Sequence, residues 1–186
     1  MDRDWILLGY RVVFPSRLDR WPWPKSPFLS VTDSLIEAFP EHDTWHTDYH
    51  DALLDWLHAP VGSRLLGVGY SRSYSSLMID DWFAPAGVYW MPRAALPVPK
   101  SPPWAVIGYE PVALGFQELD SWRYFGGDDI QALYSERRHQ INDHGLFRSH
   151  CEAVSFASVM EEFTSVEDLA WLPLMIFETD FAPIAW

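Results

Sequence analysis

The stretch from Trp5 to Phe14 constrains the fold more than any other part of the sequence. Apolar residues recur there with a period of two: Ile6, Leu8, Tyr10, Val12 and Phe14. This period is typical of a β-strand. The residues between them are also mostly apolar, so we expect this strand to occupy a central position in a sheet.

Four stretches have the periodicity and end signals of helices. A short helix is expected from about Thr32, with a capping box over 34–37, ending before Pro40. A second is expected over 43–58, a third from Asp128 to a stop at 142–145, and a fourth after a capping box at 149–152. The second helix has an apolar stripe that should face the core: Trp45, Tyr49, Ala52, Leu53, Trp56 and Leu57. In the fourth, the inward residues should be Ala153, Phe156, Ala157, Met160 and Phe163.

Further strands are expected over 64–70, 76–79, 88–91, 104–109 and 174–177. Strands and helices do not alternate regularly, which favours an α+β fold over a doubly wound parallel sheet. We expect a mixed or mostly antiparallel sheet flanked by three to four helices, in one globular domain over residues 1–186. The sequence at 22–27 recurs in similar form at 97–102, which indicates either a degenerate internal duplication or two proline-rich surface loops.

The charge and composition exclude several classes of protein. The chain has 186 residues with 13 Lys and Arg against 26 Asp and Glu, a net charge of −13, which argues against nucleic acid as a direct ligand. Its 48% hydrophobic residues exclude a disordered chain, and its single cysteine excludes a disulfide framework and fits a cytoplasmic location. No apolar run approaches the ~20 residues of a membrane span. Of the 11 tryptophans, most should lie in the core and two or three on a recognition surface.

Candidate catalytic and metal-binding residues are sparse. His42, His46 and His50 are spaced at i, i+4 and i+8, so two of them would be neighbours on a helix and could share a metal such as zinc. The simpler interpretation is an amphipathic helix bordered by histidines, and we assign no metal and no cofactor. Cys151 is expected to be a buried structural thiol. The paired acids at 80–81 and 128–129 are expected to cap backbone donors rather than bind a cation.

Two stretches carry nearly all of the excess charge. No Lys or Arg occurs between Lys25 and Arg64, or after Arg148, and each stretch contains seven acids. Such polarised charge steers a basic partner and raises its association rate. If the stripe of the second helix packs inward, Asp48, Asp51 and Asp55 project to solvent. We therefore predict a partner-binding surface formed by these three aspartates and by Glu161, Glu162, Glu167 and Asp168.

The second half of the chain resembles bacterial immunity proteins of polymorphic or contact-dependent toxin systems. The resemblance covers about residues 104–178 and rests on four short motifs, at 105–112, 120–122, 141–147 and 171–178. Where such proteins often have a small turn bearing Cys or Asn, this chain has Arg-Tyr-Phe-Gly-Gly at 123–127, so the toxin type stays open.

The resemblance implies a small, non-catalytic cytoplasmic protein that binds a cognate toxin domain and occludes its active site. An acidic surface would complement a basic toxin such as a nuclease. Two alternatives stay open from the residues alone. One is a small metal-dependent enzyme using His42, His46 and Asp51, and the other is a protein-binding adaptor.

Overall fold

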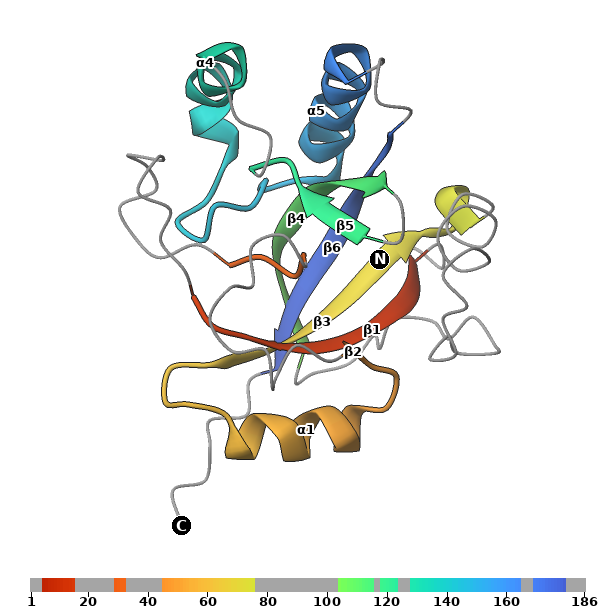
Figure 1. Cartoon of the computed structure of the whole chain (residues 1–186), viewed down its shortest axis with the longest axis vertical. Coiled ribbons are helices and arrows are strands. Elements are labelled where there is room, and N and C mark those ends of the chain that lie inside the picture. The colour runs from red at the N-terminus through yellow and green to blue at the C-terminus, as the bar shows by residue number, and fades with distance from the viewer. Residues whose placement is uncertain are drawn as a thin grey trace.

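A computed structural model describes residues 5–15, 29–32, 45–75, 104–115, 118–123, 128–164 and 169–179 (Figure 1). Its strands are β1 (Trp5–Val13), β2 (Trp45–His46), β3 (Arg64–Ser71), β4 (Trp104–Gly115), β5 (Glu118–Ser121) and β6 (Ala170–Thr179). Its α-helices over these ranges are α1 (Tyr49–His58), α4 (Asp128–Arg137) and α5 (His150–Phe163), and the short 3₁₀ helices are η3 (Arg72–Tyr74) and η5 (Arg138–Gln140). This confirms the α+β class with an antiparallel sheet.

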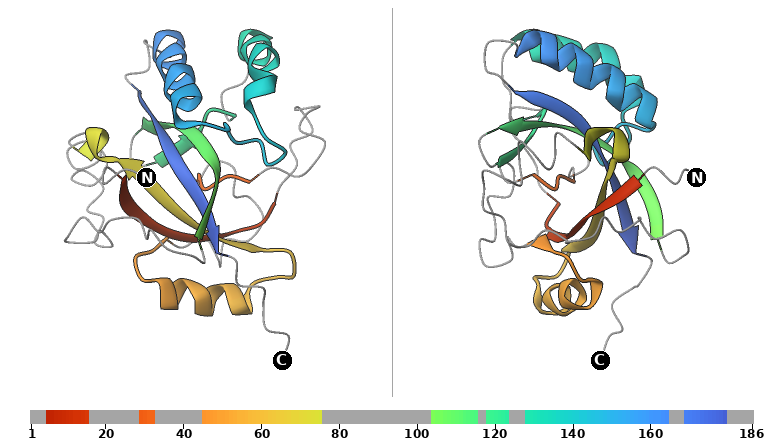
Figure 2. Two further views of the ribbon diagram at one scale, coloured as in Figure 1. Left: turned by 180° about the vertical axis from the view of Figure 1, so that it is seen from behind. Right: turned by 90° about the vertical axis from the view of Figure 1, so that its right-hand side faces the viewer.

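The six strands form one curled sheet in the order β2-β1-β3-β6-β4-β5, and every neighbouring pair is antiparallel. The inner face of the curl carries one apolar cluster, which includes Leu29 and Val31 from the segment 29–32. The outer face is divided between two clusters. One packs under α4 and α5, and the other packs under α1 (Figures 1 and 2).

The expected strand is confirmed as β1, but it is not central: it lies second in the sheet, beside the two-residue edge strand β2, and its alternation changes side at a β-bulge. Leu7 and Gly9 pair with successive residues of β3, which leaves Leu8 as an extra residue. Because the side-chain period of a strand is two, one extra residue exchanges the faces of everything that follows. The inner cluster receives Ile6, Leu8 and Val13, whereas Leu7, Tyr10 and Val12 pack under α1. The prediction of a single face from Ile6 to Phe14 was therefore wrong after Leu8.

The second expected helix is shorter than predicted, because it begins at Tyr49 rather than near Asp43. Asp48 caps it by accepting hydrogen bonds from the backbone N–H groups of His50 (2.8 Å) and Asp51 (3.3 Å). Trp45 and His46 lie before this cap and pair with β1 as strand β2. The apolar stripe also ends early: Ala52 is buried, but Leu57 is 48% exposed.

The helix after Ser149 has the predicted capping box, in which Ser149 Oγ accepts from Glu152 N and the Glu152 carboxylate accepts from Ser149 N. Its predicted inward residues Ala153, Phe156, Ala157 and Met160 are buried. Phe163, the last residue of α5, was wrongly assigned to this face, because its side chain is 49% exposed. The turn predicted after the third helix contains Gly145 at φ 75°, a left-handed conformation that glycine adopts without strain. α4 itself ends earlier, at Arg137, and η5 follows it.

β4 and β6 are longer than expected, and β5 was missed because its four residues carry little periodicity. The described tryptophan side chains are buried or half-buried: Trp5, Trp45, Trp56, Trp122 and Trp171. None of these five is an exposed anchor. The strands expected over 76–79 and 88–91, the helix after Thr32, the paired acids at 80–81 and the proline-rich segments lie outside the described residues.

Candidate functional site

The predicted partner-binding aspartates lie on α1 but do not share one environment. Asp48 and Asp51 are exposed at the start of the helix, where Asp48 also acts as the N-cap. Carboxylates at this end of a helix interact favourably with its dipole. Both charges therefore stabilise α1 and remain accessible to a partner.

Asp55 differs from the prediction that all three aspartates project into solvent. Its side chain is 19% exposed, and its Oδ2 lies 3.1 Å from Nε2 of His46, whose side chain is 16% exposed. This contact ties β2 to α1. Asp55 is therefore tied to a side chain of another element, and it contributes less exposed charge than Asp48 and Asp51 do.

The second predicted acidic surface lies at the other end of the molecule. Glu161 and Glu162 are exposed in the last turn of α5, whereas Glu167 and Asp168 lie outside the described residues. In every view of Figures 1 and 2, α1 lies at one end of the sheet and α5 at the opposite end. The body of the sheet separates the two acidic helices, so one compact interface does not cover both.

The metal-site interpretation depended on a helix that includes His46, and that premise is wrong. His46 lies on β2 and contacts Asp55, while His50 is exposed on α1 and His42 lies outside the described residues. Within the described ranges, no group of three or more His, Cys, Asp or Glu side chains is placed to hold a metal ion. The enzyme alternative built on His42, His46 and Asp51 therefore loses its helical geometry.

Cys151 was expected to be buried, but it is exposed in the first turn of α5. The preceding residue, His150, is half-buried between aromatic rings. Its ring centroid lies 4.9 Å from that of Trp5, in an edge-to-face arrangement, and 5.7 Å from that of Tyr109. Burial lowers the pKa of His150 below its ordinary value, so the imidazole is neutral at pH 7.

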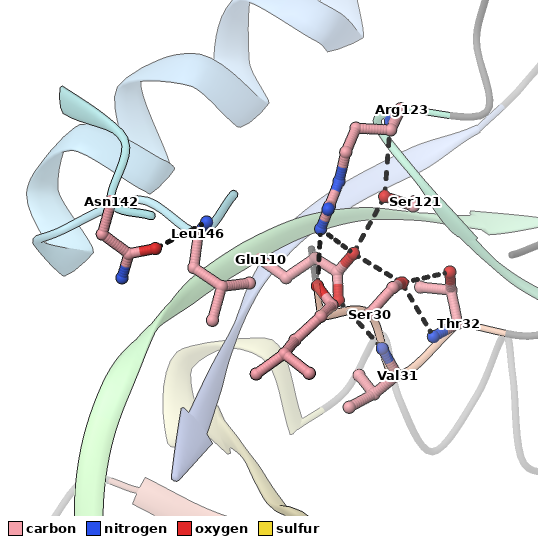
Figure 3. A network of polar contacts seen from close by, with 9 residues as sticks. Ser30, Val31, Thr32, Glu110, Ser121, Arg123, Asn142 and Leu146 are labelled. Atoms are coloured by element: carbon pink, nitrogen blue, oxygen red, sulfur yellow. Dashed lines mark hydrogen bonds and ion pairs between the residues drawn. The ribbon is translucent and has the colours of Figure 1, made fainter. Parts of the chain in front are cut away.

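A buried carboxylate, Glu110 of β4, organises the polar interior of the curl (Figure 3). Its Oε1 accepts hydrogen bonds from Ser30 Oγ (2.7 Å), Ser121 Oγ (2.8 Å) and the Arg123 guanidinium (2.9 Å). Its Oε2 accepts one from the Val31 backbone N–H (3.1 Å). Four donors, one of them the cationic guanidinium of Arg123, satisfy this carboxylate, so burying its charge is tolerable.

Two buried arginines complete this network around the segment 29–32. Arg123 also donates to the carbonyl of Leu29 (2.9 Å), and Arg11 of β1 donates to the carbonyl of Val31 (2.7 Å). Arg11 also lies over the ring of Trp45, with its guanidinium carbon 5.0 Å from the ring centroid. Charged side chains thus bind the backbone of residues 29–32, which is not part of a described strand, and hold it against the inner face.

The charged groups of this network are buried, which makes the network a structural feature of the fold. Glu110 and Arg11 are fully buried, and Arg123 is 1% exposed. These groups are directed at one another and at protein backbone rather than at solvent, so we assign the network to folding. Sequence reasoning missed all three, although an isolated charge within an apolar strand such as Arg11 was a usable signal, because a buried charge needs a dedicated partner.

Among the described helices, none is both long and apolar enough to cross a membrane. The geometry leaves the exposed acids of α1 as the candidate functional surface, with those of α5 as a second. Comparison with protein-family models, curated proteins and solved structures gives no match to this chain.

Proposed function

We propose that this chain is a non-catalytic cytoplasmic immunity protein. It would bind a cognate bacterial toxin domain, a basic one such as a nuclease, and occlude its active site. The observation that carries the proposal is the exposed acidic start of α1, within a stretch from 26 to 63 that contains no Lys or Arg. The resemblance of residues 104–178 to immunity proteins adds the class of partner.

The electrostatics of α1 supports binding of a basic protein. Asp48 and Asp51 are three residues apart, and like charges at this spacing on a helix repel by about 0.2–0.5 kcal/mol. The next basic residue along the chain, Arg64, is already paired with Glu178 of β6. Lys or Arg side chains of a partner would therefore find unneutralised carboxylates at α1 and gain association rate from them.

Co-expression tests the proposal directly. The toxin domain used is the C-terminal domain encoded by the gene adjacent to this one, produced in a sensitive host with and without the chain. We expect the chain to restore growth and to co-purify with the domain. Growth arrest that persists with the chain present, together with no complex between the purified proteins, would refute the proposal. A complex that forms with no toxic activity to neutralise would instead favour the adaptor alternative.

The position of the interface is tested by a matched pair of charge variants. Replacing Asp48 and Asp51 with Asn removes two exposed charges and keeps a side-chain oxygen for the N-cap. Replacing Glu161 and Glu162 with Gln removes the same charge at the opposite end of the molecule. We expect the α1 variant to slow association at low salt by more than the α5 variant, with the difference disappearing at high salt. The reverse order would place the partner at α5.

A further inference from the structure

The outward side of α1 is apolar at its centre, which the charge pattern of the sequence does not indicate. Leu54 is 44% exposed, and Leu57, one turn further on, is 48% exposed. Val61, just after the helix, is completely exposed. Residues three or four apart lie on the same face of a helix, so Leu54 and Leu57 form one surface.

Two further apolar side chains are exposed near the end of this helix, Val61 and Phe14. Phe14 is 39% exposed, and its ring lies next to Gly62, where an added Cβ would be 3.4 Å from Phe14 Cε2. We call Leu54 and Leu57, which share one face of α1, the α1 outer patch. Within the described residues, the other large hydrophobic side chains of this exposure are Phe14, Val61, Val106 and Phe163. Single exposed apolar residues are ordinary, but two on adjacent turns beside exposed acids offer an apolar centre for an interface.

Folding does not require the α1 outer patch. α1 already packs on the sheet through Ala52, which is fully buried, and through Tyr49, Leu53 and Trp56, which are half-buried against the outer-face cluster. Trp56 is further held by its indole N–H, which donates to the Ser63 carbonyl (2.9 Å). Leu54 lies on the solvent side of the same helix, so its exposed surface gains nothing from the fold.

The charge around the α1 outer patch indicates the chemistry of its partner. Asp51 is exposed three residues before Leu54, and Asp48 is exposed at the start of the helix. Lys and Arg lay their methylene stems on apolar surface while their charged ends reach carboxylates. A second copy of this chain would instead bring acids against acids and be repelled. The patch therefore fits a protein surface with apolar side chains at its centre and Lys or Arg around them.

We propose that the α1 outer patch is the energetic centre of the partner interface, with Asp48 and Asp51 at its rim. This inference rests on the proposed function and assigns the binding energy of that complex to apolar contacts. Buried apolar anchors at the centre of an interface carry most of its affinity, whereas rim charges mainly change the association rate. The two sets of residues should therefore differ in which rate constant they affect.

The test is the affinity of a double variant, Leu54→Ala with Leu57→Ala, for the purified C-terminal domain encoded by the adjacent gene. Alanine keeps the helix propensity, and the circular dichroism spectrum and melting temperature report that the fold is intact. We expect Kd to rise at least about 30-fold, which corresponds to the ~2 kcal/mol that marks a hot spot, mainly through faster dissociation. The matched control is Phe163→Ala, because Phe163 is equally exposed but lies on α5. It should leave Kd within about twofold, the range of contacts outside a hot spot.

The outcomes separate this inference from the proposed function. If the unaltered chain binds the toxin domain and the double variant loses less than 30-fold, the inference is overturned and the proposed function stands. If the unaltered chain does not bind the domain at all, the proposed function fails and takes the inference with it. If light scattering shows a dimer of the chain that the double variant dissociates, the patch belongs to a second copy and the inference is again overturned.

Discussion

Replacing Arg123 with Met should destabilise the fold severely, because its buried guanidinium is paired with the buried carboxylate of Glu110. The guanidinium of Arg123 is 2.9 Å from both Glu110 Oε1 and the Leu29 carbonyl. Without it, the Glu110 carboxylate remains fully buried, and its other hydrogen bonds in the structure come from the neutral groups of Ser30, Ser121 and Val31. Removing one partner of a buried ion pair costs about 3–5 kcal/mol.

That loss is large against the total stability of a domain, about 5–15 kcal/mol. With a urea dependence of about 2 kcal/mol/M, the unfolding midpoint should fall by about 1.5–2.5 M. The assay is equilibrium urea unfolding followed by tryptophan fluorescence and circular dichroism together. Arg148→Met is the control, because Arg148 is exposed and its loss should change stability by no more than about 0.5 kcal/mol.

A double-mutant cycle identifies the cause of the loss. Glu110→Gln keeps the size of the side chain and one acceptor oxygen, but it strands the charge of Arg123. Combining it with Arg123→Met leaves neither charge buried, so the double variant should lose about 1–3 kcal/mol less than the sum of the single variants. Additive effects within 0.5 kcal/mol, or a loss below about 1 kcal/mol for Arg123→Met alone, would refute the assignment of this pair to folding.

Three other predictions concern a glycine, a helix cap and two buried tyrosines. An alanine at Gly67 would place its Cβ 2.1 Å from the Phe177 ring. Gly67→Ala should therefore lower the free energy of unfolding, measured by urea titration, by about 1–3 kcal/mol. Adding Phe177→Leu to the same chain should recover part of that loss. Asp48→Ala should cost about 1 kcal/mol through loss of the α1 cap while Asp48→Asn is nearly neutral, and equal losses for the two would exclude capping as the cause. Burial raises the pKa of Tyr10 to about 12, and burial also raises the pKa of Tyr134. As the pH rises, the unfolded chain therefore loses these phenolic protons before the folded chain does, which favours unfolding. The free energy of unfolding should be unaffected by these groups below about pH 10 and should decline between about pH 10 and 12, which urea midpoints measured across that range would test.

Much of the secondary structure was encoded locally and could be predicted. The run from Trp5 to Val13 forms a strand whose apolar residues pack on both faces of the sheet, and the helix after Ser149 begins at its capping box. These features depend on neighbouring residues only. Local signals were weaker at the start of α1, where Trp45 and His46 fit the helical stripe equally well. There the tertiary structure decided, since pairing with β1 and the cap at Asp48 place the two residues in a strand.

The candidate surface divides in the same way. The sequence alone determined that acids gather in the stretch from 26 to 63 without Lys or Arg, because charge is a property of composition. Which side chains face solvent was decided by the tertiary structure. There, Asp55 contacts His46, Leu57 is exposed, and the acids of α1 and α5 lie at opposite ends of the sheet. Burial and long-range pairing involve residues far apart in the chain, as Glu110 and Ser30 are, so only the assembled sheet decides them.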